Sequence, residues 1–366
     1  MSRRQYTRAA EYFDRTQTRQ LQVGGLRMGG QDKVLIQSMT NTKTKDAAAT
    51  ISQIKALLTA GCDLVRLAVL DEEDAEVLPQ IVDAIEAPLV ADIHFNYRLA
   101  LKAADSGIAK IRINPGNIGG EDRVRQVVQA CRSRGIPIRI GINSGSLEKS
   151  LIAKYGVPCP EAMIESAEGQ VKLLEAMEFH DIALSFKSSD VPLTIASYRL
   201  ASEIFPYPLH LGVTEAGTVK YSAVKSSAAL GGLLYDGIGD TIRISVSDDP
   251  LEEIPVARQL LKAFNLVPDM PDLISCPTCG RIQYDMLPHL KEIEEYLVTA
   301  KKDITVAVMG CAVNGPQEAS RADIGVAGGK NEALLFSRGE IIGKVPQDQL
   351  VAAVKKLIDE YVPETA

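Results

Sequence analysis

The sequence predicts an α/β protein made of a (β/α)8 TIM barrel followed by a second, smaller α/β domain. Short runs rich in Val, Ile and Leu recur eight times over roughly 220 residues, and helix-like stretches separate most of them. Apolar strands that alternate with helices are typical of a parallel sheet covered on both faces. Eight such units in succession are typical of a closed barrel.

Each predicted barrel strand ends in polar or glycine-rich residues. The strands begin near residues 34, 64, 89, 110, 138, 181, 209 and 241, and helix-like stretches occupy residues 47–61, 73–86, 119–135 and 165–180. An open doubly wound sheet shows the same alternation and is the alternative fold. It is disfavoured because no G-x-G-x-x-G sequence follows the first strand.

A change of pattern after the eighth strand predicts the domain boundary. Residues 255–265 read as the helix that closes the barrel, and residues 264–275 read as a linker with two prolines. We therefore expect domains at 1–265 and 266–366. The second is predicted to contain helices at 284–300 and 347–362, strands at 304–310 and 322–329, and a hairpin that turns at Arg338-Gly339.

Composition excludes several classes of function. A formal net charge of −7 argues against nucleic acid as a partner, because phosphate binding needs an excess of Lys and Arg. No apolar run is long enough to span a membrane, and the N-terminus shows no export signal. We therefore expect a cytoplasmic protein whose six cysteines are reduced thiols or metal ligands.

Five cations gather at the predicted strand ends, where TIM barrels build their active sites. They are Arg66, Arg112, Arg139, Lys187 and Arg243. The same ends carry Asp92, His94, Asn114, Asn143 and Glu215. A buried cation is costly unless it is paired. The partners are either an internal ring of Asp92, Glu215, Asp240 and Asp248, or an anionic ligand such as a diphosphate, which we favour because Arg matches phosphate oxygens.

Three cysteines in the second domain have the spacing of metal ligands. Cys276 and Cys279 form a C-x-x-C pair, and Cys311 follows a short apolar strand through a glycine. The residues themselves leave two alternatives, an iron–sulfur cluster or a structural zinc with His289 as fourth ligand. We favour the cluster, because His289 lies within a predicted helix. Cys62, Cys131 and Cys159 are predicted to take no part.

Several motifs in this arrangement resemble one enzyme family. The runs IQSMTNT, KIRINPGN, GIGDTIRIS, SCPTCGR and MGCAVNGP resemble the 4-hydroxy-3-methylbut-2-enyl diphosphate synthases, over nearly the whole chain from about Thr16 to Val362. The resemblance implies a [4Fe–4S] cluster and ferredoxin or flavodoxin as electron donor. It implies reductive ring opening of 2-C-methyl-D-erythritol 2,4-cyclodiphosphate with loss of water, a step of isoprenoid biosynthesis by the methylerythritol phosphate pathway.

The resemblance also assigns site residues. It implies the cluster ligands Cys276, Cys279, Cys311 and Glu318, the diphosphate-binding cations Arg66, Arg112, Arg139, Lys187 and Arg243, and the polar substrate contacts Asp92, Asn143 and Glu215. Glu215 is the candidate proton donor to the leaving oxygen, with Asp92 and His94 as alternatives. Gln317 stands where the family has a glycine before its glutamate ligand. A left-handed backbone there would strain glutamine by about 1–2 kcal/mol.

A head-to-tail homodimer is the expected assembly. The last barrel helix should end at the face opposite the strand ends, and residues 265–275 reach at most roughly 35 Å. A partner chain would then supply the cluster to each barrel, as the family is thought to do. The sequence is also compatible with two other functions: a zinc-stabilised barrel enzyme acting on another phosphorylated substrate, and a non-enzymatic iron–sulfur electron carrier.

Overall fold

The computed structural model describes residues 15–267, 270–300, 302–312 and 315–362. The chain divides into two compact units, Met1–Leu266 and Val267–Ala366. The sequence placed this division one residue earlier. Each unit has its own sheet and its own core.

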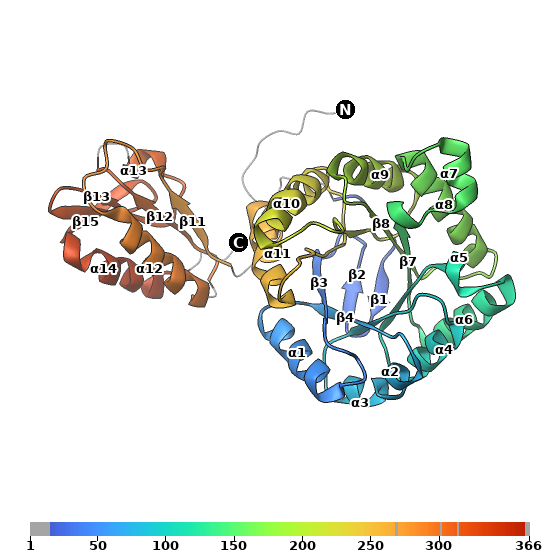
Figure 1. The fold of residues 1–366 in the computed structure, drawn as a ribbon. Helices are drawn as coiled ribbons and strands as arrows, with labels where there is room; N and C mark the ends of the chain where they lie inside the picture. The colour runs from blue at the N-terminus through green and yellow to red at the C-terminus, as the bar shows by residue number, and fades with distance from the viewer. Residues whose placement is uncertain (1–14, 268–269, 301, 313–314, 363–366) are drawn as a thin grey trace. The chain divides into compact units, whose positions relative to one another are not determined.

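The first unit is the predicted (β/α)8 barrel (Figure 1). All eight strands occur where the sequence placed them. They are β3 (Leu35–Met39), β4 (Leu64–Ala68), β5 (Leu89–Asp92), β6 (Lys110–Ile113), β7 (Ile138–Asn143), β8 (Ile182–Lys187), β9 (His210–Leu211) and β10 (Thr241–Ile242). They pair in parallel in the order β8-β7-β6-β5-β4-β3-β10-β9, and a bridge between Leu184 and Leu209 brings the first and last strands together. The open doubly wound alternative is therefore wrong.

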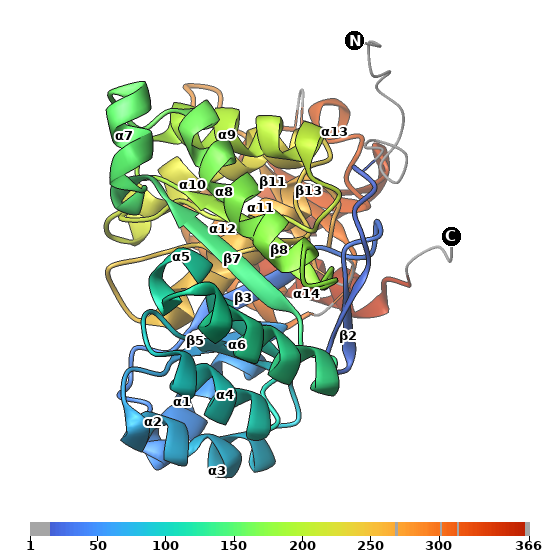
Figure 2. The same ribbon diagram turned by 90° about the vertical axis from the view of Figure 1, so that its right-hand side faces the viewer.

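Helices surround this barrel (Figure 1), and neighbouring ones such as α4 and α6 pack side by side (Figure 2). They are α1 (Ala47–Thr59), α2 (Glu72–Glu76), α3 (Leu78–Asp83), α4 (Tyr97–Asp105), α5 (Pro115–Ile118), α6 (Glu121–Arg134), α7 (Lys149–Tyr155), α8 (Pro160–Glu175), α9 (Val191–Ile204), α10 (Val219–Tyr235) and α11 (Glu253–Ala263). The single helix expected over 73–86 is broken at Val77. Pro79 explains the break, because proline fits only the first turn of a new helix.

A hairpin that the sequence analysis missed closes the N-terminal end of the barrel (Figures 1 and 2). Its strands are β1 (Leu21–Val23) and β2 (Leu26–Met28). Their buried side chains pack on the first inward-facing residues of the barrel strands, including Leu35, Leu64 and Val90. This end is therefore plugged by apolar side chains, and any ligand site lies toward the C-terminal ends.

The second unit is a five-stranded mixed sheet. Its order is β11 (Asp272–Ser275), β12 (Thr305–Met309), β13 (Ile324–Gly328), β14 (Glu332–Ser337) and β15 (Glu340–Pro346). The first three are parallel and the last two antiparallel. Helices α12 (Met286–Thr299) and α14 (Leu350–Glu360) pack on one face, and the short α13 (Gly315–Glu318) belongs to the other.

Two details of this unit bear on the sequence predictions. The hairpin turns at Arg338-Gly339 as predicted, and both residues have the positive φ that such a two-residue turn needs, 50° and 83°. The expected linker over 264–275 is wrong in its last part. Asp272–Ser275 forms the edge strand β11, which pairs with β12. In the described part of the chain no helix is both long and apolar enough to cross a membrane.

Candidate active site and cluster-ligand loops

A buried salt-bridge network occupies the C-terminal end of the barrel interior. Arg66, Asp92 and Arg112 come from three adjacent strands, and each is less than a tenth exposed. Asp92 Oδ1 lies 3.0 Å from Arg112 Nη1, and its Oδ2 lies 3.5 Å from Arg66 Nε. One carboxylate therefore pairs with two guanidinium groups and offsets one of their two charges.

These ion pairs and the burial of the site shift the pKa values of Asp92 and Arg66. Burial alone would raise the pKa of Asp92, but Arg66, Arg112 and Arg139 outweigh burial and hold the pKa at about 2. Burial lowers the pKa of Arg66 to about 10, although Asp92 partly opposes this. Asp92 is therefore ionised throughout the physiological pH range.

Acid unfolding should report this network. Because the folded pKa of Asp92 is depressed, its contribution to stability is complete above its unfolded pKa of about 3.9. That contribution is lost as pH falls toward about 2. We expect Asp92→Asn to flatten the pH dependence of the unfolding free energy in this window, measured by urea unfolding at several pH values. An unchanged slope would contradict the pairing.

The second carboxylate of the network was missed by the sequence analysis. Glu253, at the start of α11, is 2% exposed, and its Oε1 lies 2.9 Å from Arg243 Nη2. Ser38 Oγ donates to Glu253 Oε2 at 2.7 Å. The available signal in the sequence was a glutamate just ahead of the predicted closing helix, but its burial follows only from the structure.

The ring of carboxylates considered from sequence is largely wrong. Asp240 precedes β10 and lies at the opposite end, where it pairs with Arg15 and accepts from Leu209 N. Among the described residues, neither Glu215 nor Asp248 forms an ion pair with the five cations. Only Asp92 of the four carboxylates pairs with them.

Two of the five cations have no carboxylate partner. Within the described ranges, no carboxylate lies within 4 Å of Arg139 or Lys187, which are 0% and 8% exposed. Arg139 Nε and Nη1 and Arg112 Nε are buried without any hydrogen-bond partner. Burial, followed by the neighbouring guanidinium groups, lowers the pKa of Lys187. Five cations therefore face two carboxylates, and buried donors of this kind require an anion or ordered water.

Two glycines let these cations lie deep in the barrel. A Cβ on Gly141 would lie 2.6 Å from Arg112 Nε, and one on Gly212 would lie 3.0 Å from Lys187 Nζ. The absence of a side chain at these positions leaves room for the two cationic groups.

We expect Gly141→Ala to weaken anion binding without unfolding the protein. The flexible end of Arg112 can move away from the new methyl group, so the fold survives but the guanidinium leaves its place. The expected loss of diphosphate affinity is on the order of tenfold, measured by calorimetry. Gly145→Ala is the matched control, because a Cβ there meets nothing within 4 Å. Equal affinities in the two variants would contradict the role of this gap.

The other predicted substrate contacts lie at the same end of the barrel. Asn143 is the last residue of β7 and pairs in register with Lys187. Glu215 lies in the loop after β9, exposed and with a positive φ of 53°. Hydrogen bonds from Thr214 N to Ser188 O and from Ser247 N to Gly217 O tie this loop to its neighbours. A non-glycine residue in this backbone region is uncommon and is held by its surroundings.

The three predicted cluster cysteines lie on two adjacent loops of the second unit. Cys276 follows β11 and Cys311 follows β12 through Gly310, and these strands are parallel neighbours, so their ends meet at one edge of the sheet. Gly310 N donates to Cys276 Sγ at 3.1 Å. Arg281 hydrogen-bonds to Cys279, which lowers the pKa of that thiol.

Glu318 belongs to the same neighbourhood. Arg281 interacts electrostatically with Cys279, Cys311 and Glu318. Gln317, which departs from the family pattern, lies in the short helix α13. It is not among the described residues with a left-handed φ, so the strain considered from sequence does not arise.

The donor set fits an iron–sulfur cluster better than a zinc ion. His289 stacks on the Tyr284 ring, with centroids 5.8 Å apart. Across the described ranges, no three His, Cys, Asp or Glu side chains lie close enough together to hold a metal centre of either kind. Three thiols on two adjacent loops, with a carboxylate on α13, suit a cluster, because the ligands of a cluster bind different irons. A backbone N–H that donates to a ligating sulfur, as Gly310 does to Cys276, is usual at such sites.

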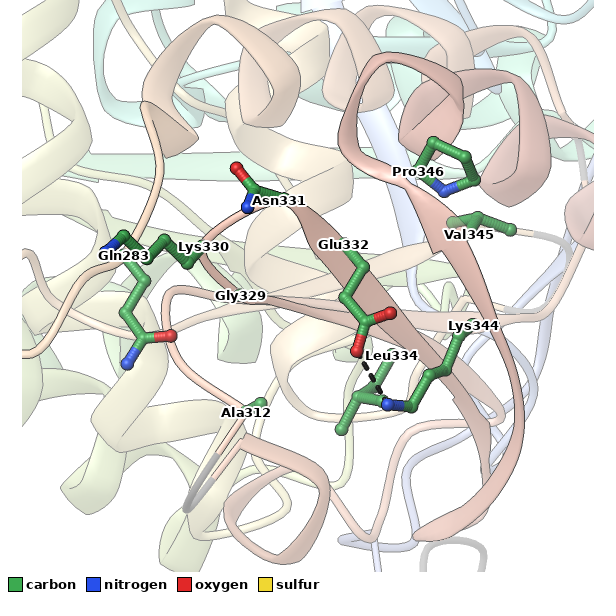
Figure 3. Close-up of a pocket in the computed structure, with 10 residues that line it drawn as sticks. All are labelled: Gln283, Ala312, Gly329, Lys330, Asn331, Glu332, Leu334, Lys344, Val345 and Pro346. Carbon is green, nitrogen blue, oxygen red and sulfur yellow. Dashed lines mark hydrogen bonds and ion pairs between the residues drawn. The ribbon is translucent and has the colours of Figure 1, made fainter.

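A cavity of about 680 Å³ opens beside these loops (Figure 3). Ala312, directly after Cys311, lies on its wall together with Gln283. On the far side, Lys344 Nζ pairs with Glu332 Oε1 at 2.6 Å (Figure 3). The loop that carries Cys311 is thus accessible from this cavity.

Comparison with known proteins identifies the family. The sequence model described as the GcpE TIM-barrel domain matches residues 18–258, and the model of the GcpE protein C-terminal domain matches residues 272–360. The chain belongs to the GcpE family. The matched regions cover most of both units and include the buried cations and the cysteine loops described above.

GcpE relatives with assigned names cover nearly the whole chain. A 4-hydroxy-3-methylbut-2-en-1-yl diphosphate synthase (flavodoxin) of Clostridium perfringens is 56% identical over 95% of this chain and 99% of its own. The protein of the same name in Bacillus licheniformis is 54% identical over 97% of this chain and 96% of its own. Among solved structures, a dihydropteroate synthase from Stenotrophomonas maltophilia aligns over 68% of this chain and 99% of its own, with 15% identity and a TM-score of 0.49.

Proposed function

We propose that this chain catalyses the reductive ring opening of 2-C-methyl-D-erythritol 2,4-cyclodiphosphate to 4-hydroxy-3-methylbut-2-enyl diphosphate. Two electrons and two protons enter, one C–O bond to the diphosphate breaks, and the oxygen of one hydroxyl leaves as water. The observation that carries the proposal is the excess of buried cations at the C-terminal end of the barrel, on a chain that also bears three thiols on two adjacent loops. Relatives that bear the name of this synthase support it.

The barrel residues would bind and orient the substrate. Arg66, Arg112, Arg139, Lys187 and Arg243 would hold the diphosphate, which supplies the charge that Arg139 and Lys187 lack in the protein. Asp92 would fix the two guanidinium groups that it pairs with, and Asn143 would contact the carbon skeleton. Glu215 would hold the proton for the leaving oxygen, because its loop places an exposed carboxyl at the strand ends.

The second unit would hold a [4Fe–4S] cluster on Cys276, Cys279, Cys311 and Glu318. When bound, such a cluster supplies low-potential electrons and a Lewis-acidic iron. Arg281 would offset part of the negative charge of these ligands. Electrons would come from flavodoxin, as the relatives' names say of them, or from ferredoxin. Reduced thiols and such donors fit a cytoplasmic enzyme.

Replacing Glu318 should separate cluster binding from turnover. A carboxylate holds iron more weakly than a thiolate, so we expect Glu318→Gln to keep most of the iron but lose most of the activity. Gln317→Gly, one residue away on α13, is the control and should leave both unchanged. Iron analysis and anaerobic turnover measure the two effects. Complete loss of iron would show that Glu318 is needed for assembly, and full activity would remove it from the site.

We also propose a head-to-tail homodimer in which each barrel works with the cluster of its partner. Barrel helices run antiparallel to their strands, so α11 ends at the plugged end of the barrel, away from the cations. The eight residues between Ala263 and Asp272 reach at most about 28 Å. That length leaves nothing to wrap around a barrel, whereas a two-fold partner needs no such path.

Anaerobic turnover tests the proposed function. The purified protein, reconstituted with iron and sulfide, should convert the cyclodiphosphate to the linear diphosphate only when a reductant is present. Product formed without reductant would indicate a non-redox enzyme. Iron and sulfide content in a protein without turnover would instead indicate an electron carrier.

A further inference from the structure

The barrel interior beneath the proposed diphosphate site is unusually polar. TIM barrels fill this space mainly with Val, Ile and Leu. Here three inward-facing polar residues, which we call the inner polar set, lie below the Arg66–Asp92–Arg112 network. They are Gln37 on β3, Lys110 on β6 and His210 on β9, each no more than 1% exposed.

Neighbouring residues place this set between the β1–β2 hairpin and the cations of the proposed diphosphate site. Lys110 Nζ lies 3.8 Å from Met28 Sδ of the plugging hairpin, and Arg112 follows two residues later on the same face of β6. His210 lies two residues before Gly212. Lys187 Nζ is 3.0 Å from the position that a Cβ on Gly212 would take. The set is therefore the floor of the proposed diphosphate site.

Lys110 is enclosed without any carboxylate partner. Across the described residues, no Asp or Glu oxygen lies within 4 Å of its ammonium nitrogen. The charged groups that interact with it are Arg139 on β7 and Arg66 on β4, both cations. Burial, followed by these two guanidinium groups, lowers the pKa of Lys110 well below its ordinary value.

The other members of the set are also incompletely satisfied. His210 Nδ1 lies 2.6 Å from Thr241 Oγ1, but its Nε2 has no partner. Both amide atoms of Gln37 lack partners as well. The groups that face His210 are Arg139, Lys187, Lys110 and Arg66, and after burial they lower its pKa. The nearby carboxylate Asp92 is engaged by Arg66 and Arg112.

We propose that Lys110 is a buried proton acceptor for substrate binding, neutral in the free protein and protonated when a diphosphate binds above it. This proposal rests on the proposed function. The free protein already concentrates positive charge here, so one more ammonium is unfavourable. A bound diphosphate reverses the local field, and Lys110 then takes one proton from solvent. The added charge favours a multiply charged ligand over a singly charged one.

Proton uptake can be measured by calorimetry on the full-length, cluster-loaded protein with inorganic pyrophosphate as the probe. Titrations at about pH 8, in two buffers of different ionisation enthalpy, give the number of protons taken up per site. Wild type should take up about one proton more than Lys110→Met. Pyrophosphate ionises equally in both experiments, so its own protons cancel in the difference. Methionine is close to lysine in length and removes a buried amine that has no carboxylate partner, so the variant should fold.

Each outcome tests either the role of Lys110 or the proposed diphosphate site. Equal uptake by wild type and Lys110→Met overturns the role of Lys110, and a loss of uptake in His210→Gln alone would move the proton to His210. Failure of pyrophosphate to bind wild type would overturn the proposed diphosphate site itself. A second measurement needs no variant: the dissociation constant of wild type should rise with pH more steeply than the ionisation of pyrophosphate explains, by up to tenfold per pH unit. The absence of this excess would also overturn the proposal.

Discussion

Changing Cys276 to serine is expected to abolish both the iron–sulfur cluster and all measurable turnover. A serine hydroxyl stays protonated near neutral pH and is a poor ligand for iron, whereas the thiolate is a strong one. Cys276 is half-buried, packs against the cores on both faces of the small sheet and accepts the Gly310 N–H. The expected readouts are loss of the brown colour, of bound iron and sulfide, and of anaerobic activity.

Cysteines outside the two loops provide matched controls. Cys62→Ser should keep cluster and activity, because Cys62 Sγ donates to Ile36 O and Leu64 O and a hydroxyl can do the same. Cys159→Ser should also be silent, since Cys159 only precedes α8. Loss of iron in the Cys159→Ser protein would show that the ligand assignment is wrong.

Co-expression of Arg112→Ala and Cys276→Ser chains is expected to restore activity that neither variant has alone. If each site joins the barrel of one chain to the cluster of its partner, a mixed dimer has one intact site. Random pairing makes half of the dimers mixed, so about a quarter of wild-type activity should return. The measurement is specific activity after separate affinity tags have shown that mixed dimers formed. Recovery near zero in such dimers would place each site within one chain.

A double variant supplies the control for this experiment. Wild type co-expressed with a chain that carries both Arg112→Ala and Cys276→Ser gives mixed dimers with two defective sites, if sites are shared between chains. Activity should then be about a quarter of wild type, from the wild-type homodimers alone. Sites built within one chain would leave about half.

Local patterns explain why the sequence predicts so much of this fold. The apolar strands of the barrel and the turn at Arg338-Gly339 depend on neighbouring residues, and the structure confirms them. The edge strand β11 was missed because two prolines and few apolar residues precede it, and its pairing with β12 is a contact between distant segments. The N-terminal hairpin is likewise stabilised by distant strands, through Leu35, Leu64 and Val90.

The sequence predicts one part of the candidate site, and the tertiary structure decides the rest. That Arg66, Arg112, Arg139, Lys187 and Arg243 lie at one end of the barrel follows from their places on parallel strands, and the cysteine spacing follows from the sequence alone. The pairing of each carboxylate with a cation does not follow from the sequence, because the partners come from strands and helices far apart in the chain. Tertiary structure puts Glu253 against Arg243, sends Asp240 to the opposite end, and leaves Lys110 buried among guanidinium groups. Residue type and spacing set the chemistry available, but only packing decides which charges are neutralised and which await a ligand.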